Sequence, residues 1–109
     1  MSAFGITAPI DKTWTLFLDR DGVVNEENVG FYVTTWEEFH FCEGALEALK
    51  SLKDIFGRIV IVTNQRGVGR GVMTRETLKE INYNTTMAVA EAGGHIDKIY
   101  ACTAVDDND

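Results

Sequence analysis

This sequence of 109 residues has only one proline, two cysteines and no cluster of basic residues, and it lacks any long apolar run. The scarcity of proline and the absence of low-complexity tracts argue against disorder. Because no apolar run approaches the ~20 residues of a membrane span, we expect no membrane partner. Residues 1–14 lack the basic start and apolar stretch of a signal peptide, so we expect a cytoplasmic protein. The length suits a single domain over 1–109.

The chain carries an excess of acidic residues. Acidic residues outnumber basic residues by 17 to 10, which gives a net charge of −7. A strongly acidic domain without a basic face is repelled by phosphate backbones, so we expect no nucleic-acid partner. An anionic small molecule stays possible if local cations or a metal offset the repulsion. Cys42 and Cys102 stand in no metal-ligand spacing, and Cys42 is expected to serve packing.

Apolar runs alternate with segments of helical periodicity along the chain. We predict strands over 14–18, 58–63 and 97–102, an extended piece over 36–41, and helices over 43–56 and 74–92. The continuous apolar runs are typical of strands buried on both faces. This order predicts an α/β fold with a Rossmann-like parallel sheet and right-handed crossovers. Ligands of such sheets bind beyond the carboxyl ends of the strands.

The first strand ends in the motif "LFLDRDGVVN", residues 16–25. Asp19 and Asp21 are two residues apart, so in an extended chain their side chains point the same way. Two carboxylates on one side repel each other, and a bound Mg²⁺, which prefers oxygen ligands, relieves that repulsion. Gly22 lets the backbone turn sharply. A plain polar turn after the strand is the alternative interpretation.

The second strand ends in "VTNQRGVGRG", residues 62–71. The Thr63 hydroxyl, backbone N–H groups from Asn64 onward, the glycines, and the charges of Arg66 and Arg70 are the components of an anion cradle. Neither a P-loop nor a dinucleotide fingerprint fits this segment. The alternative is a flexible connection with solvated arginines. Because neighbouring parallel strands end at the same edge, we expect both motifs to face one ligand.

Together these motifs resemble those of the haloacid dehalogenase superfamily. "LFLDRDGVVN" is similar to its motif I, and "IVIVTN" is similar to its motif II. With "FHFCEGALEALKSLK" between them, the likeness extends over about 15–102. Within the superfamily, the sequence resembles more narrowly the branch that contains D-glycero-D-manno-heptose 1,7-bisphosphate phosphatase and histidinol-phosphate phosphatase. The resemblance implies the core fold of the superfamily, with a short loop over 26–39 in place of a large cap domain. It also implies that this chain is the N-terminal portion of that core and stops after the third strand.

The resemblance also implies roles for individual residues. Asp19 would be the nucleophile that forms an aspartyl-phosphate, and Asp21 would act as general acid and then as general base. The Asp19 side chain and the backbone carbonyl of Asp21 would hold Mg²⁺. The residues implied to contact phosphate or substrate are Thr63, Asn64, Gln65, Arg66, Arg70 and Asn25. Arg20 is expected to point away from both aspartates and to be structural.

These features predict a Mg²⁺-dependent phosphatase for a small phosphorylated metabolite, for example the sugar phosphate heptose 1,7-bisphosphate. The alternatives are a histidinol-phosphate phosphatase and a non-catalytic phosphate-binding or receiver-like module. The superfamily's phosphate-binding Lys or Arg of motif III and the acidic pair of motif IV are absent from 1–109, so we expect the chain alone to have little activity. The substrate stays open, and so does the oligomeric state, although a monomer is favoured.

Overall fold

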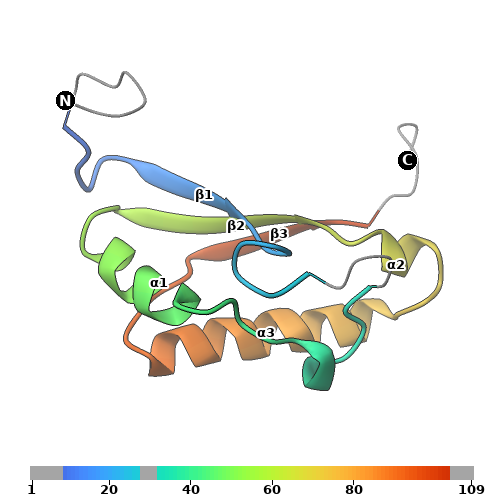
Figure 1. Ribbon diagram of the computed structural model, residues 1–109. Helices are drawn as coiled ribbons and strands as arrows, with labels where there is room; N and C mark the ends of the chain where they lie inside the picture. The colour runs from blue at the N-terminus through green and yellow to red at the C-terminus, as the bar shows by residue number, and fades with distance from the viewer. Residues whose placement is uncertain (1–8, 28–31, 104–109) are drawn as a thin grey trace.

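Three parallel strands form one sheet in the order β1–β2–β3 in the computed structural model, which describes residues 9–27 and 32–103. The strands are β1 (Thr15–Asp19), β2 (Arg58–Asn64) and β3 (Lys98–Cys102). Parallel pairing sets Asp19 opposite Val62 in one ladder and Asn64 opposite Cys102 in the other. The predicted α/β fold, its strands and its parallel order are confirmed (Figure 1).

The connections between the strands carry the helices. The crossover to β2 contains α1 (Ala45–Lys53), and the crossover to β3 contains α2 (Arg66–Gly69) and α3 (Arg75–Glu91). Thr74 caps α3 as predicted, because its side chain accepts a hydrogen bond from the Thr77 amide. After α3, Gly93 adopts a φ of 94°, which favours glycine and ends the helix where predicted. The short helix α2 lies inside the segment that we expected to be a glycine-rich loop.

The core lies between the sheet and the helices. In α3, Leu78, Ile81, Thr85 and Val89 are buried at helical spacing, as the periodicity predicts. They belong to one face of the helix, and the buried cluster continues onto the inner face of β2 through Ile59 and Ile61. Burial of this apolar face is the main stabilising contribution to the fold.

The sheet is covered on one face only, and the prediction of strands buried on both faces is wrong for the described residues. Phe17 is 63% exposed, Val62 44% and Tyr100 52%, and the strand register places all three on the same face. Strand order explains this: both crossovers run in the same direction across the sheet, so right-handed connections put α1 and α3 on the same side. Figure 1 shows both helices beneath the sheet.

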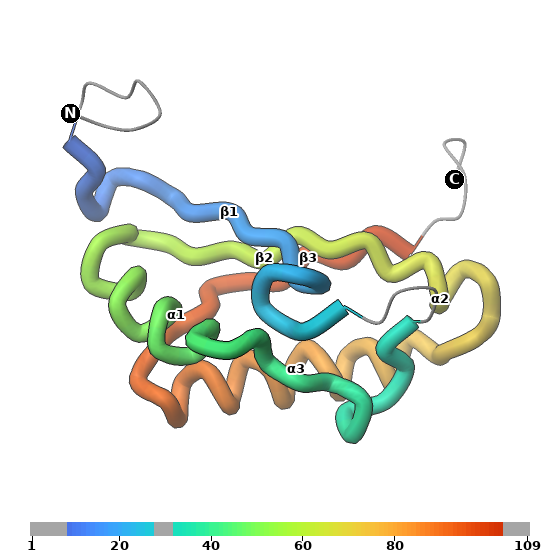
Figure 2. Tube along the Cα trace, viewed as in Figure 1, coloured from blue at the N-terminus to red at the C-terminus, as the bar shows by residue number. Residues whose placement is uncertain are grey.

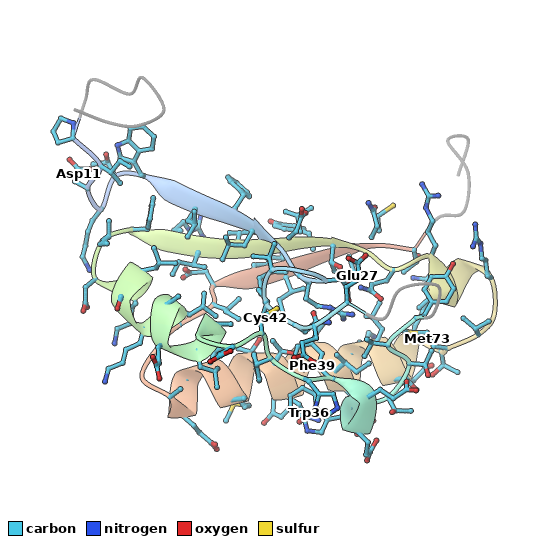
Figure 3. All side chains as sticks on the ribbon, in the orientation of Figure 1. Asp11, Glu27, Trp36, Phe39, Cys42 and Met73 are labelled. Atoms are coloured by element: carbon cyan, nitrogen blue, oxygen red, sulfur yellow. The ribbon has the colours of Figure 1, made fainter. Side chains whose placement is uncertain are left out.

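The segment before α1 is also different from the prediction. Instead of an extended piece over 36–41, the chain forms a short 3-10 helix, η1 (Trp36–Glu38), followed by Phe41 in an isolated bridge with Asn25. The Thr35 side chain accepts from the Glu38 amide, which favours a tight turn over a strand. Trp36 and Phe39, labelled in Figure 3, stack with ring centroids 5.0 Å apart, and Phe39 is buried. The aromatic cluster of Trp36, Phe39 and Phe41 is therefore part of the core.

The expected loop cap is described only in part, because residues 28–31 lie outside the described residues. In 9–27 and 32–103 no helix is long and apolar enough to cross a membrane. Cys42 is half-buried and Cys102 exposed, and both are free thiols.

Candidate active site

A cavity of about 570 Å³ opens at the carboxyl ends of β1 and β2. Five residues predicted from the two motifs line it: Asp19, Asp21, Thr63, Asn64 and Arg70. They come from segments more than 40 residues apart, and the parallel pairing of β1 with β2 brings them together. The expected convergence of both strand ends on one site is therefore present in the structure, at the edge where parallel sheets bind ligands.

The segment after β1 folds back on itself. The Arg20 carbonyl accepts hydrogen bonds from the amides of Val23, Val24 and Asn25, and the Gly22 amide donates to the Asn25 carbonyl. Gly22 has a φ of 87°, in the left-handed region that favours glycine. This turn places the Asn25 side chain beside Asp21 (Figure 2 shows the segment curling back at the end of β1).

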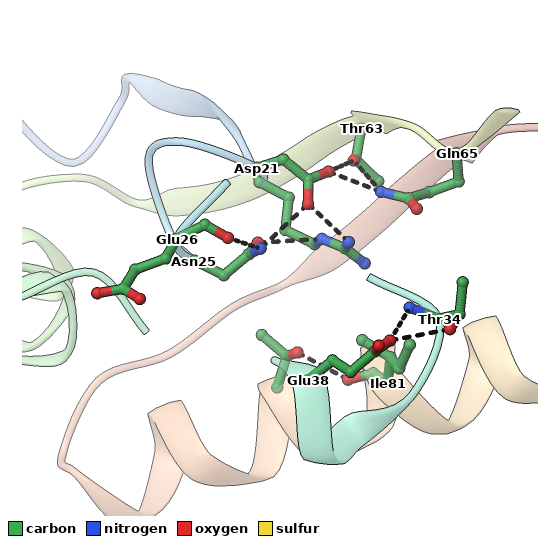
Figure 4. Close-up of polar contacts among 10 residues, drawn as sticks. Asp21, Asn25, Glu26, Thr34, Glu38, Thr63, Gln65 and Ile81 are labelled. Atoms are coloured by element: carbon green, nitrogen blue, oxygen red, sulfur yellow. Dashed lines mark hydrogen bonds and ion pairs between the residues drawn. The ribbon is translucent and has the colours of Figure 1, made fainter. Parts of the chain in front are cut away.

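The Asp21 carboxylate is held by four side chains (Figure 4). Its Oδ1 accepts from Arg20 Nη2 at 2.8 Å and from Asn25 Nδ2 at 3.0 Å. Its Oδ2 accepts from Gln65 Nε2 at 2.8 Å and from the Thr63 hydroxyl at 3.3 Å. Donors from both strand ends therefore fix this carboxylate, whereas Asp19 presents an exposed side chain at the end of β1.

Arg20 differs from the prediction, because its side chain does not point away from Asp21. It is completely buried, pairs with Asp21 at 2.8 Å, and donates from Nε to the Asn25 side chain at 3.2 Å. Its guanidinium lies 5.5 Å from the Phe39 ring centroid, and its Nη1 has no hydrogen-bond partner among the described residues. The prediction assumed strand alternation, but the strand ends at Asp19, and the turn that follows breaks the alternation.

The other predicted contact residues have different positions. Asn25 and Gln65 are buried, at 0% and 2% exposure, and their side chains bond Asp21 rather than line the cavity. Arg66 is exposed on α2 and is not among the residues that line the cavity. Their contact with a substrate stays a prediction.

Three polar side chains line the cavity that were not predicted to do so: Arg20, Glu27 and Tyr32. Arg70 Nη1 donates to the Tyr32 hydroxyl at 2.6 Å, which joins the segment before η1 to the loop after β2. A side chain at Gly67 would come within 3.2 Å of Tyr32 Cγ, so the absence of a Cβ there lets Tyr32 pack closely. The sequence signal for Tyr32 was its aromatic side chain inside the largely polar stretch 26–39.

No family model matches the chain, but individual relatives do. It is 45% identical over 89 residues to a D-glycero-alpha-D-manno-heptose-1,7-bisphosphate 7-phosphatase of Mycobacterium tuberculosis, covering 82% of this chain and 47% of the relative. It is 38% identical over 95 residues to a D-glycero-D-manno-heptose-1,7-bisphosphate 7-phosphatase of Chlorobaculum tepidum, again covering 47% of the relative.

A solved structure agrees. D,D-heptose 1.7-bisphosphate phosphatase from B. bronchiseptica, complexed with magnesium and phosphate, superposes with a TM-score of 0.80 at 35% identity. The match covers 87% of this chain and 53% of that one. Over most of its length the chain is related to heptose-bisphosphate phosphatases of the haloacid dehalogenase type. It spans about half the length of the curated relatives that it matches.

The site has oxygen ligands suited to Mg²⁺. In the described ranges no group of three or more His, Cys, Asp or Glu side chains is arranged to hold a metal ion by itself. Asp19 and Asp21 nevertheless line one open cavity. Mg²⁺ is commonly held by one or two carboxylates, with water and substrate phosphate completing its shell. The residues present therefore fit a shared metal–phosphate site rather than an all-protein cage.

The environment of Asp21 sets its charge. Burial raises the pKa of Asp21, but the hydrogen bond and charge of Arg20, with the Asn25 and Gln65 donors, outweigh burial and leave the pKa below its usual value. Asp21 is therefore ionised at neutral pH in the free protein, as a general base requires.

Proposed function

We propose that the cavity is the active site of a Mg²⁺-dependent phosphatase that hydrolyses a small phosphorylated metabolite through an aspartyl-phosphate. The observation that carries this proposal is the meeting of an exposed Asp19, a fixed Asp21 and Thr63 in one cavity at two strand ends. The relation to heptose-1,7-bisphosphate 7-phosphatases supports it.

In the first step, an Asp19 carboxylate oxygen attacks phosphorus, and the bond from phosphorus to the sugar oxygen breaks. Asp21 gives a proton to that oxygen, so the sugar leaves as an alcohol. In the second step, Asp21 removes a proton from water, whose oxygen attacks phosphorus and releases inorganic phosphate and the free Asp19 carboxylate. These two steps replace the direct hydrolysis of a phosphate monoester, which is so slow without a catalyst that enzymes accelerate it by up to ~10²¹-fold.

The acid role of Asp21 requires a proton that the free protein does not hold, because donors keep its pKa low. A phosphate anion beside a carboxylate disfavours its ionised form and so raises its pKa. Asp21 must therefore take up a proton as substrate binds, before the leaving oxygen needs it.

The phosphoryl group would be bound by the Thr63 hydroxyl, the Asn64 amide and the Arg70 guanidinium, all at the cavity. The Asp19 carboxylate and the backbone carbonyl of Asp21 would hold Mg²⁺, whose charge would offset the repulsion between the Asp19 carboxylate and phosphate. The volume of about 570 Å³ is in the range of small-ligand sites and admits a sugar phosphate. We propose heptose 1,7-bisphosphate as substrate, because the matched relatives bear that name.

The test is release of inorganic phosphate from heptose 1,7-bisphosphate and from histidinol phosphate, with and without Mg²⁺. We expect slow release by 1–109, faster from the heptose substrate, and its loss in Asp19→Asn. Release unchanged in Asp19→Asn would remove Asp19 from the mechanism. Mg²⁺-dependent binding of phosphate without any release would favour a non-catalytic binding module instead.

A further inference from the structure

Gln65 lies directly after β2 in an unusual position for a glutamine. Its side chain is 2% exposed, whereas most glutamines are exposed. Its backbone amide donates to the Cys102 carbonyl at 2.7 Å, which ties the residue to the end of β3. The side chain therefore starts from a fixed backbone, and Gln65 is not among the residues that line the cavity.

The two N–H groups of the Gln65 amide have two different acceptors. Nε2 lies 2.8 Å from Asp21 Oδ2 and 2.8 Å from Thr63 Oγ1. An amide NH₂ has two protons, so both contacts can be made at once. Gln65 therefore bridges the carboxylate proposed as acid and base and the hydroxyl proposed to bind phosphate.

The Thr63 hydroxyl has a single proton, and its present use is weak. Thr63 Oγ1 lies 3.3 Å from Asp21 Oδ2, a long distance for a hydroxyl–carboxylate bond. When a phosphoryl oxygen enters the cavity, that proton can turn to it. Asp21 Oδ2 then keeps Gln65 as its donor, while Arg20 and Asn25 still hold Oδ1.

We propose that Gln65 is a positioning residue that holds Asp21 and Thr63 together during turnover, and that its side chain does not contact the substrate. This inference rests on the phosphatase function proposed above. Without Gln65, Asp21 loses its strong donor on Oδ2 as soon as Thr63 binds phosphate. The carboxylate can then rotate, and a misplacement of about 1 Å can cost ~10²-fold in rate.

The first arm of the test needs no activity. Gln65 is the only glutamine in the sequence, so selective ¹⁵N labelling of glutamine side chains gives a single amide pair in an NMR spectrum. We expect slow solvent exchange of these protons and a large shift change in Asp21→Asn. Exchange as fast as in free glutamine, or no response to Asp21→Asn, overturns the proposed contact.

The second arm measures phosphate release by Gln65→Met, which keeps the side-chain length and removes both N–H donors. We expect kcat to fall ~10²-fold with KM nearly unchanged. Gln65→Glu should be worse, because it sets a carboxylate against Asp21, whereas Lys79→Met on the exposed side of α3 should match the wild type. A raised KM with unchanged kcat, or full activity of Gln65→Glu, overturns the proposal.

The two arms separate this inference from the proposed function. If the wild type releases no phosphate, the phosphatase function fails, and the exchange of the Gln65 amide alone decides whether Gln65 positions Asp21. If the wild type is active and Gln65→Met is equally active, only the positioning role fails.

Discussion

Arg20 and Asp21 are neighbours in the sequence and form an ion pair at 2.8 Å, with Arg20 completely buried and the Asp21 side chain 28% exposed. Adjacent residues on a regular strand point to opposite faces and could not make this contact. The turn that follows β1 makes it possible, and it brings a buried positive charge to the carboxylate from the side opposite Gln65. The positive charge of Arg20 therefore balances the negative charge of Asp21 in the protein without ligand.

Removing that charge should destabilise the protein. Arg20→Met leaves Asp21 without its ionic partner and removes the guanidinium from the Phe39 ring. Because hydrogen bonds to charged groups contribute ~1.5–3 kcal/mol, we expect the free energy of unfolding to fall by about 2 kcal/mol in a urea titration. Arg20→Lys keeps the charge without the planar fork and should lose less. Wild-type stability of Arg20→Met would show that the ion pair contributes nothing.

The low pKa of Asp21 also predicts how stability depends on pH. A carboxyl whose pKa is lower in the folded state stabilises the fold above its unfolded pKa, and this contribution disappears as the pH falls through the folded value. The ordinary pKa of an aspartate is 3.8, and that of Asp21 is lower in the folded protein. We therefore expect the free energy of unfolding of the wild type to fall below pH 3.8 relative to that of Asp21→Asn. Parallel pH curves of unfolding free energy for the two proteins would contradict the lowered pKa.

The one-sided sheet predicts a contrast between two strand residues. Phe17 on β1 is 63% exposed, whereas Ile61 on β2 is completely buried. Ile61→Ala should lower the free energy of unfolding by ~2–5 kcal/mol, the usual cost of truncating a buried side chain. Phe17→Ala should change it by no more than about 0.5 kcal/mol, as is usual for surface sites. Equal losses in denaturant titrations would mean that the outer face is covered in solution.

Sequence patterns predicted the sheet because its strands are short apolar runs separated by well-marked helices, and Thr74 and Gly93 mark the two ends of α3. The meeting of Asp19, Asp21 and Thr63 in one cavity could be predicted because neighbouring parallel strands end at the same edge of the sheet. What the patterns could not give was the direction of side chains after a strand ends. Arg20 was misplaced for this reason, since the turn after β1 decides where its side chain points. Likewise, the sequence did not indicate that the Gln65 side chain is buried in an amide network.

The uncovered face was missed for a different reason. An apolar run such as 58–63 has the same composition whether one face or both are covered, and strand order alone decides which. The short helix η1 was missed because the aromatic residues of 36–41 favour strands locally, whereas the Thr35 cap and the stacking of Trp36 on Phe39 favour the turn.

The most direct test of the account is a crystal structure of the chain with Mg²⁺ and trifluoroberyllate, a mimic of a phosphoryl group bound to an aspartate. We predict that beryllium bonds an Asp19 carboxylate oxygen and that a fluorine accepts a hydrogen bond from the Thr63 hydroxyl. Density for the fluoride bonded to another residue, or a gap between Asp19 and Thr63 too wide for one group to bridge, would contradict the shared site.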